Sequence, residues 1–504
     1  MKMRWAFLSI NQSMTLEDYT TKTRELLLAR KFQDALAMSK QAVREHPRQA
    51  QFYVFLAECL EQTGQAQYAW PVYERAWMLD PQAAWLPDVR ARVEKKTAKK
   101  LPDWLSDLLT VPTVRIAAAV IAKNEERTIA ACLNALKSAV DQIVVIDTGS
   151  TDKTVEIAKK HGAEVHPFTW DDDFSAARNE ALKHIQADWV LWVDADEIFD
   201  PEDVNVPRIA GGLYQELDPP SVLRIIQVNM IDGKPEPNYD MSRFFPMRFG
   251  LRWWGRIHEQ IGPPSGGLFS ELYARPVVRI RVNHDGYDPT IMQAKGKLER
   301  NITLLKKSVE DDPNDIGSLG FLGREYYLTQ QYEEAVRVLY RAEAIAMTNP
   351  KYGRLPEVRA YLVEALMRLN RHQEAIVASE RAIQADPNFP TAWFGLGKAR
   401  LGYGLSLIRD AFQDFANSRD RAPMYRGIVS YDSQIATWKA LASLADVAKV
   451  QGDWVRARQF YLQALEQSPG NPAILGQIQF IDAQAAAIVA QSQAQPLGNP
   501  GTNH

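Results

Sequence analysis

The sequence predicts an α/β domain between two all-α segments, and two observations support this prediction. Between residues 112 and 300, short β-rich runs alternate with helical stretches, which is typical of a parallel sheet with right-handed crossovers. On either side, over residues 14–98 and 301–482, alanine-rich blocks recur at the spacing of paired helices. The chain has 504 residues, 46% of them hydrophobic, so it can bury more than one core.

Two blocks of the N-terminal segment repeat. They end in Pro47 and Pro81, which are 34 residues apart, and Ala35 and Ala69 share that interval. A period of 34 residues, with small residues at fixed helical positions and a closing proline, resembles the tetratricopeptide repeat. Pro71 departs from the pattern, and we expect it to kink its helix or delay the helix start.

Similar blocks return late in the chain, beginning at Gln331, Arg371 and Gly452. Their spacing is looser, which implies an insertion over residues 351–356, and a degenerate copy is expected over residues 406–423. We interpret residues 301–482 as an array of helical hairpins. The periodicity is lost after this array, so residues 483–504 are predicted to form a frayed helix and a disordered tail.

Charge and cysteine content exclude several classes of protein. The chain has 59 basic and 62 acidic residues, a near balance that gives no broad field to attract nucleic acid or an anionic membrane. Cys59 and Cys132 stand far apart without ligand-type neighbours, so we expect buried thiols. The first residues, MKMRWAFLSINQSM, hold too short an apolar run for a signal peptide. No segment approaches about 18 uninterrupted apolar residues, so we expect a cytoplasmic protein without a membrane span.

Acidic residues close two of the predicted strands. Asp147 ends QIVVID, and Asp194 and Asp196 follow the apolar run of DWVLWVDADE. The carboxyl ends of parallel strands share one edge, where α/β sheets bind ligands. In an extended segment, residues i and i+2 point the same way, so the two later carboxylates should lie together with Ala195 turned aside. Paired oxygen ligands suit Mg²⁺ or Mn²⁺ held against a diphosphate, whereas the alternative is a solvated turn or a helix cap.

Four motifs carry a family resemblance. They are VIAKNEE (120–126), VVIDTGSTDKT (144–154), FTWDDDFSAARNEAL (168–182) and DWVLWVDADE (188–197). In this order and spacing they resemble the nucleotide-binding half of family 2 glycosyltransferases, whose GT-A fold is a Rossmann-like mixed sheet. The added tetratricopeptide blocks make the chain similar to the peptide S-glycosyltransferase subgroup. The resemblance implies a nucleotide-sugar donor, commonly a UDP-sugar, and a divalent cation as cofactor.

The resemblance also assigns donor-binding residues. The backbone around Ala122, Asn124 and Glu125 and the carboxylate of Asp147 would hold the base and ribose. Asp152 is assigned equally to the donor or to the start of the helix that follows.

Acidic and basic residues of the third motif, FTWDDDFSAARNEAL, are also expected near the ligand-binding edge of the sheet. Arg178, on a helix that opens there, would meet phosphate or orient an acid of the DxD, and its alternative is a surface salt bridge. The run at 171–173 is expected to be a solvated turn in which Asp173 or Ser175 caps the next helix.

The second half of the site is expected to cover the sugar and the acceptor. An inverting transfer needs a base to deprotonate the acceptor, and by the resemblance we choose Glu259, with Asp240 or Asp285 as the alternative base. His258 and His284 compete for the role of third metal ligand or of hydrogen-bond donor to phosphate, and the alternative for each is a structural histidine. Trp254 is assigned to stacking on the donor sugar or to the core. Arg243 is expected to neutralise phosphate or to be an ordinary surface charge.

Three functions remain open at this point. The first is a metal-dependent glycosyltransferase that acts on a peptide, protein or glycan acceptor. The second is a transferase for envelope polysaccharide or lipid-linked glycan. The third is a tetratricopeptide scaffold with an inactive transferase domain, although the intact acids argue against it. The repeats are expected to bind an acceptor or partner, or to mediate self-association.

Overall fold

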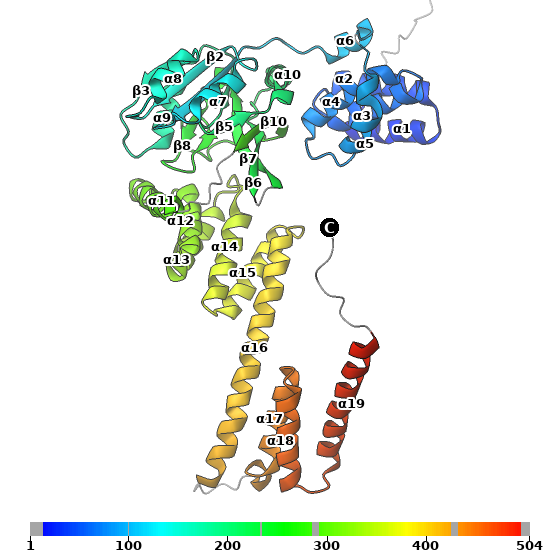
Figure 1. Cartoon of the computed structure of the whole chain (residues 1–504), viewed down its shortest axis with the longest axis vertical. Helices are drawn as coiled ribbons and strands as arrows, with labels where there is room; N and C mark the ends of the chain where they lie inside the picture. Colours follow the sequence, from blue (N-terminus) through cyan, green and yellow to red (C-terminus); the bar gives the residue numbers. More distant parts are fainter. Residues whose placement is uncertain (1–13, 99, 232–233, 285–291, 425–431, 495–504) are drawn as a thin grey trace, which may run out of the picture. The chain divides into compact units, whose positions relative to one another are not determined.

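The computed structural model describes residues 14–98, 100–231, 234–284, 292–424 and 432–494 (Figure 1). The chain divides into two compact units. The first comprises Met1–Glu325 and Ala344–Gly353, and it contains the N-terminal helices and the α/β domain. The second comprises Tyr326–Glu343 and Arg354–His504, and its described part is helical.

The N-terminal helices have a core of their own. They are α1 (Leu16–Leu28), α2 (Phe32–Glu45), α3 (Ala50–Gln62), α4 (Ala69–Leu79), α5 (Leu86–Val93) and α6 (Asp103–Leu109). The repeated alanines, Ala35 and Ala69, are fully buried, as expected for small residues where paired helices approach closely. Pro71 lies in the first turn of α4, behind a 3₁₀ turn at Ala66–Tyr68, so it delays the α-helix and does not interrupt it.

The α/β domain alternates as predicted in its first half. Its elements are β1 (Ile116–Ala122), α7 (Ile129–Leu136), β2 (Gln142–Asp147), α8 (Thr154–Lys160), β3 (Glu164–Pro167), α9 (Phe174–Leu182), β4 (Trp189–Trp192), β5 (Glu197–Phe199), α10 (Val206–Tyr214), β6 (Leu223–Ile231), β7 (Lys234–Pro246), β8 (Arg252–Trp254), β9 (Gln260–Gly262) and β10 (Val277–His284). Eight strands form one sheet in the order β3-β2-β1-β4-β7-β6-β10-β5, and β8 pairs with β9. Strands β1 to β4 are parallel, whereas β7 runs antiparallel to both β4 and β6, so the sheet is mixed.

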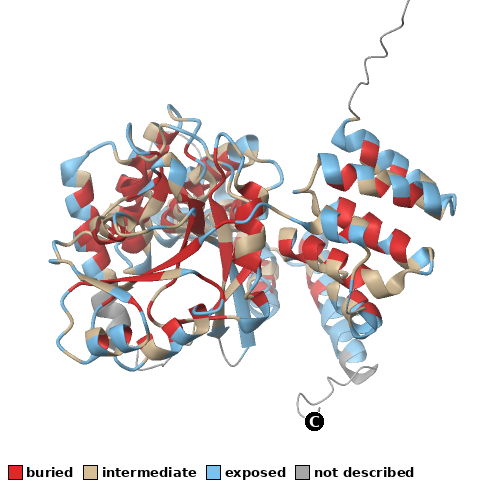
Figure 2. Cartoon of the chain, turned by 90° about the horizontal axis from the view of Figure 1, so that it is seen from above, coloured by how far each residue is buried: buried red, intermediate tan, exposed pale blue. Residues whose placement is uncertain are grey.

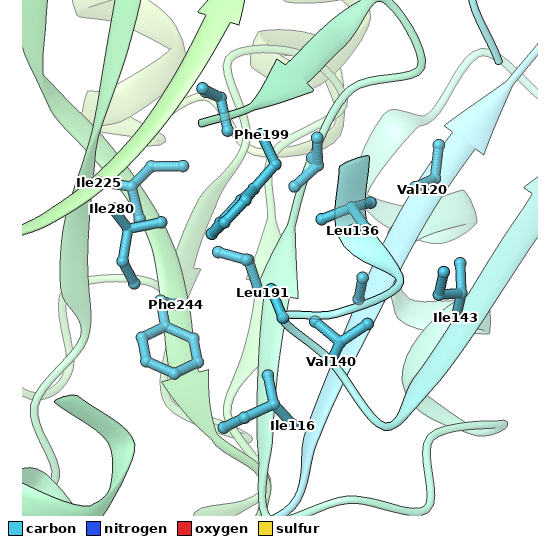
Figure 3. Close-up of a cluster of buried hydrophobic side chains, with 14 of the residues drawn as sticks. Ile116, Val120, Leu136, Val140, Ile143, Leu191, Phe199, Ile225, Phe244 and Ile280 are labelled. Atoms are coloured by element: carbon cyan, nitrogen blue, oxygen red, sulfur yellow. The ribbon is translucent and has the colours of Figure 1, made fainter. Parts of the chain in front are cut away.

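Both faces of the sheet are covered, which explains the unbroken apolar runs of β1, β2 and β4. Alternate residues of these strands enter two separate cores. One core receives Leu191 with side chains of α7 and α10, and the other receives Trp192 with side chains of α9. Figure 2 shows the central strands as buried, and Figure 3 shows side chains of the first core, among them Leu191 and Phe199. Helix α9 therefore lies on the face of the sheet that also holds Trp253.

The helices after the sheet continue to the end of the described chain. They are α11 (Met292–Asp311), α12 (Ile316–Leu328), α13 (Tyr332–Ala346), α14 (Leu355–Arg368), α15 (His372–Ala385), α16 (Pro390–Arg421), α17 (Trp438–Val450), α18 (Trp454–Gln467) and α19 (Pro472–Ala494). Most of the insertion predicted at 351–356 lies between α13 and α14, and its last residues begin α14 at Leu355. The degenerate repeat predicted at 406–423 does not form a separate hairpin, because α16 continues as one helix through most of it.

The last helix bears on two predictions. Helix α19 continues past Asp482 to Ala494, so the first part of the segment predicted as a frayed helix and a tail is helical, and residues 495–504 lie outside the described part. By length and composition, its stretch Pro472–Gln491 could cross a membrane, the one such helix among those described. Our expectation counted only uninterrupted apolar residues and therefore passed over this stretch. Its Ile474 and Ile478 pack in the core that α19 shares with α17 and α18.

Candidate active site

Three parallel strands end at one edge of the sheet and bring the predicted acids there. β1 pairs with β2 on one side, where Ala122 lies opposite Asp147, and with β4 on the other. The residues after β4, including Asp194 and Asp196, therefore lie at the same edge as Asp147. The sequence predicted this shared edge correctly.

The loops after β1 and β2 are tied together by side chains. Asp147 is buried, and its carboxylate accepts hydrogen bonds from the backbone of Gly149 at 3.3 Å and of Ser150 at 3.2 Å. Asn124 has a left-handed backbone with φ 58°, and its side-chain oxygen accepts a 2.8 Å bond from the backbone of Thr151. These bonds hold the two polar loops together at the edge of the sheet.

The remaining predicted donor residues of these loops also have structural contacts. The carbonyl of Ala122 accepts a 3.0 Å bond from the backbone of Thr148. The backbone of Glu125 donates to the Thr154 hydroxyl at 2.7 Å, and burial raises the pKa of the Glu125 carboxyl. Asp152 accepts from the backbone of Thr154 at 2.9 Å, next to the start of α8. Asp152 was assigned either to the donor or to the start of the next helix, and this contact is the one expected for a residue at the helix start.

The DxD segment is not extended, which corrects our expectation for Asp194 and Asp196. β4 ends at Trp192, and a turn at Ala195 and Asp196 leads directly into β5. Ala195 is buried in the core of the sheet, so it is not simply turned aside. The two carboxylates therefore have different partners, because the turn separates the directions that a strand would have aligned.

Asp194 faces two arginines. One carboxylate oxygen lies 2.6 Å from Nη2 of Arg243, and the other lies 3.4 Å from Nη2 of Arg178. Burial raises the pKa of Asp194, but the two guanidinium groups outweigh it and hold the pKa below its ordinary value. Asp194 thus stays ionised and orients cationic groups at the edge of the sheet.

Arg178 is the central cation of this cluster. It projects from α9 against the rings of Trp192 and Trp253, which contact each other edge to face, and its guanidinium carbon is 4.8 Å from each ring centre. Its Nε donates to Glu259 at 2.5 Å, so one side chain joins the DxD segment to the β8–β9 loop. Nη1 is buried and has no hydrogen-bond partner among the described residues. Arg178 is 8% exposed, so the surface salt bridge that we held as its alternative is wrong.

Sequence reasoning missed the partnership between Arg243 and Glu197. Glu197 is fully buried and accepts from Nη1 of Arg243 at 2.6 Å and from Gln227 at 2.6 Å. Arg243 is itself buried, so it is not an ordinary surface charge. The available signal was its place before Phe244 and Phe245 in a strand, since an arginine inside an apolar strand requires acidic partners.

Asp196 and His284 form the pair best suited to hold a cation. His284 Nε2 lies 3.3 Å from Oδ2 of Asp196, and Nδ1 lies 3.1 Å from Oδ1 of Asn229. The hydrogen bond with Asp196 raises the pKa of His284. Among the described residues, no group of three or more His, Cys, Asp or Glu side chains is arranged to hold a metal ion. An oxygen and a nitrogen ligand fit a hard or borderline ion that takes its other ligands from water or phosphate.

The two histidines have different partners, since His284 pairs with Asp196 and His258, in the β8–β9 loop, does not. His258 lies 3.0 Å from Glu325 of α12 and packs on Phe321, so it faces the helices that follow the sheet. Trp254 donates from its ring nitrogen to the carbonyl of Pro263 at 2.8 Å, which fixes the ring at the loop base. Asp285, an alternative base, lies outside the described residues.

A pocket of about 570 Å³ opens beside this loop. Trp254, Arg256 and His258 line one side of it, and Phe269 and Phe321 are among its other lining residues. The acidic run behaves as predicted, since Asp173 caps α9 by accepting from the backbone of Ala176.

Comparisons with known proteins identify the central domain. Residues 118–244 match the family model described as glycosyl transferase family 2. Residues 22–84 and 356–399 match tetratricopeptide repeat models. The chain carries a family 2 glycosyltransferase domain.

This family 2 domain, with tetratricopeptide repeats on both sides, confirms the predicted fold class. The Bacillus subtilis SPbeta prophage-derived glycosyltransferase SunS is 30% identical over 241 residues, which are 46% of this chain and 53% of that protein. The chain thus spans about half the length of this relative. A TPR repeat-containing protein of Synechococcus elongatus is 27% identical over 317 residues, 59% of this chain and 75% of that protein. Among solved structures, S. aureus TarS 1-349 with UDP-GlcNAc is 15% identical, covers 57% of this chain and 92% of that chain, and has a TM-score of 0.32.

Proposed function

We propose that the protein is a metal-dependent glycosyltransferase that moves a sugar from a nucleotide-sugar donor, a UDP-sugar, to a peptide or protein side chain. The observation that carries the proposal is the partly buried chain of charges from Glu259 through Arg178 to Asp194. It joins the strand edge of a family 2 domain to the loop that faces the pocket.

The donor would lie along the edge formed by β1, β2 and β4. The preformed loops around Asn124 and Asp147 supply hydrogen-bonding groups for the base and ribose. Arg178 and Arg243 are buried cations beside that edge, where the negative charge of a departing diphosphate develops.

Asp196 and His284 would hold Mn²⁺ or Mg²⁺. Asp196 is 44% exposed, so it can reach a cation that also takes water and diphosphate oxygens. When bound, such an ion stabilises the charge of the leaving diphosphate. Asp194 would serve this site indirectly, by orienting Arg178 and Arg243.

Glu259 would act as the base that takes the acceptor's proton. Its side chain is 11% exposed, and the ion pair with Arg178 keeps the carboxylate in one position. The pocket next to it would receive the acceptor, because the pocket is lined by the same loop. A peptide acceptor agrees with the flanking repeats, since tetratricopeptide arrays present concave surfaces for extended peptides and protein partners.

The proposal is tested by a donor-hydrolysis screen over UDP- and GDP-sugars with Mn²⁺ or Mg²⁺, for wild type and Asp196→Asn. Asn keeps the volume and removes the anionic ligand, so we expect the variant to lose turnover at an unchanged melting temperature. Host proteins incubated with the preferred donor are then analysed by mass spectrometry for the added sugar. Normal turnover by Asp196→Asn would refute the metal role, and no turnover by wild type on any donor would favour the inactive scaffold.

A further inference from the structure

The segment from Gly255 to Glu259 bends through two residues with left-handed backbones. Gly255 has φ 93° and His258 has φ 52°. Glycine takes this conformation without steric cost, whereas histidine adopts it rarely and must be held there by surrounding contacts. The next residue is Glu259, so the direction of its carboxylate depends on how His258 is held.

Helix α12 supplies the contacts that hold His258. Nε2 lies 3.0 Å from Oε1 of Glu325, and the ring lies 4.6 Å from the ring of Phe321. Arg324 reaches the same Glu325 oxygen from Nη2 at 2.8 Å. The side chain of Glu325 is 1% exposed, so its carboxylate is shielded from water, whereas the side chains of His258 and Arg324 are partly exposed.

Three polar groups meet at the end of the His258 ring. Nη2 of Arg324 lies 3.0 Å from Nε2 of His258 and donates to Oε1 of Glu325 at 2.8 Å. Because arginine only donates, Nε2 either accepts from Arg324 or donates to Glu325, and in both arrangements Glu325 holds the arginine and the ring together. His258 is therefore fixed by short polar contacts to two residues on a regular helix.

We propose that Glu325 is a positioning residue, which acts through His258 to hold the Gly255–Glu259 segment so that Glu259 meets Arg178. This inference rests on the proposed function, in which Glu259 is the base. Glu325 belongs to α12, outside the 112–300 segment that the sequence assigned to catalysis. The first helices after the sheet thus complete the active site from a distance, by fixing a strained loop.

The kinetic test uses Glu325→Ala and Glu325→Gln with the donor found in the screen. We expect Glu325→Ala to lower kcat by about 10²-fold, as a displaced catalytic group does. The KM for the donor should change little, because the loops around Asn124 and Asp147 are untouched. Glu325→Gln retains an acceptor oxygen for His258 or Arg324, so part of the rate should return.

A matched control separates positioning from folding. Glu343 on α13 is also buried, and it accepts from Arg359 at 2.7 Å and from Arg381 at 2.7 Å. Glu343→Ala should lower thermal stability and leave kcat per folded molecule unchanged. An equal loss of kcat in both alanine variants, or a loss of folded protein alone in Glu325→Ala, would overturn the inference.

A second measurement does not depend on turnover. Hydrogen–deuterium exchange of residues 255–260 should accelerate in Glu325→Ala and stay as in wild type in Glu343→Ala. Unchanged exchange in Glu325→Ala would contradict the positioning role even in an active enzyme. Accelerated exchange in a protein that turns over no donor would support the clamp on the loop and count against the proposed function alone.

Discussion

At the scale of single residues, the site depends on arginines that have two partners each. Arg178 bridges Glu259 and Asp194, and Arg243 bridges Asp194 and Glu197. A guanidinium can serve two carboxylates at once because its donors form a planar fork. An ammonium group cannot reproduce this geometry.

Arg178→Lys therefore tests the bridge while keeping the charge. Lysine can reach one of the two carboxylates, so we expect donor turnover to fall by about 10²-fold, the cost of removing one preorganised donor. Arg208→Lys is the control, because Arg208 pairs with Asp141 at 2.9 Å on a partly exposed surface. The rate of steady-state hydrolysis of the preferred donor is measured for both variants. Equal rates for Arg178→Lys and Arg208→Lys would show that the planar fork of Arg178 is not needed.

Glu259→Gln separates binding from chemistry. Glutamine keeps the shape of the side chain but cannot take a proton, so transfer should stop while UDP still binds. Calorimetric titration with UDP and a transfer assay give the two readouts. Retained transfer would move the base to another carboxylate, Asp240 or Asp285.

The residues that sequence reasoning found and those it missed differ in their partners. Asp147, Arg178 and Asp194 belong to local motifs, so their edge of the sheet could be predicted from strand order. Glu197 and Glu325 act through partners 46 and 67 residues away, which no local pattern reports.

At the scale of elements, the errors have local physical causes. The strand predicted over 188–197 ends at Trp192, because buried Ala195 turns the chain into β5. The hairpin predicted at 406–423 is one helix, because no proline interrupts the stretch before Pro423 and helix formers continue the pattern. Apolar periodicity predicts which elements exist better than where they end.

A contact between elements gives a prediction for acid stability. Glu202 receives hydrogen bonds from Arg90 of α5 and from Arg281 of β10, the latter at 2.9 Å. The bond from Arg90, more than that from Arg281, lowers the pKa of Glu202 from 4.5 to about 2. A lowered pKa in the folded state gives stability that is present above 4.5 and is lost as pH falls towards 2.

Glu202→Gln should therefore flatten the fall of the melting temperature over that acid range. Melting curves of wild type and variant from pH 6 to about pH 2 measure the effect. Parallel curves would mean that this contact gives no pH-dependent stability.

At the scale of the whole molecule, the chain combines two units, each with buried cores. All the predicted site residues lie in the first unit. The order of repeat, α/β and repeat segments could be read from the sequence because periods of 34 residues and strand–helix alternation are long-range patterns. The unit boundaries within α12, within α13 and before α14 could not be predicted, because they depend on tertiary packing.

Leu362→Ala tests whether the second unit can be destabilised without destabilising the first. Leu362 is fully buried in α14, and truncating such a leucine costs about 2–5 kcal/mol. We expect hydrogen exchange to accelerate in the second unit, with UDP affinity unchanged. A matched loss of UDP affinity would show that the two units fold as one.

The central claim is that carboxylates and arginines at the edge of β1, β2 and β4 bind a nucleotide-sugar together with a cation. Thermal-shift titration with UDP, with and without Mn²⁺, tests it most directly for wild type and Asp196→Asn. The account predicts a metal-dependent stabilisation of wild type, about 2.7 kcal/mol at a hundred times the dissociation constant, that is lost in the variant. No stabilisation of wild type by UDP and Mn²⁺, or an equal one in Asp196→Asn, would contradict it.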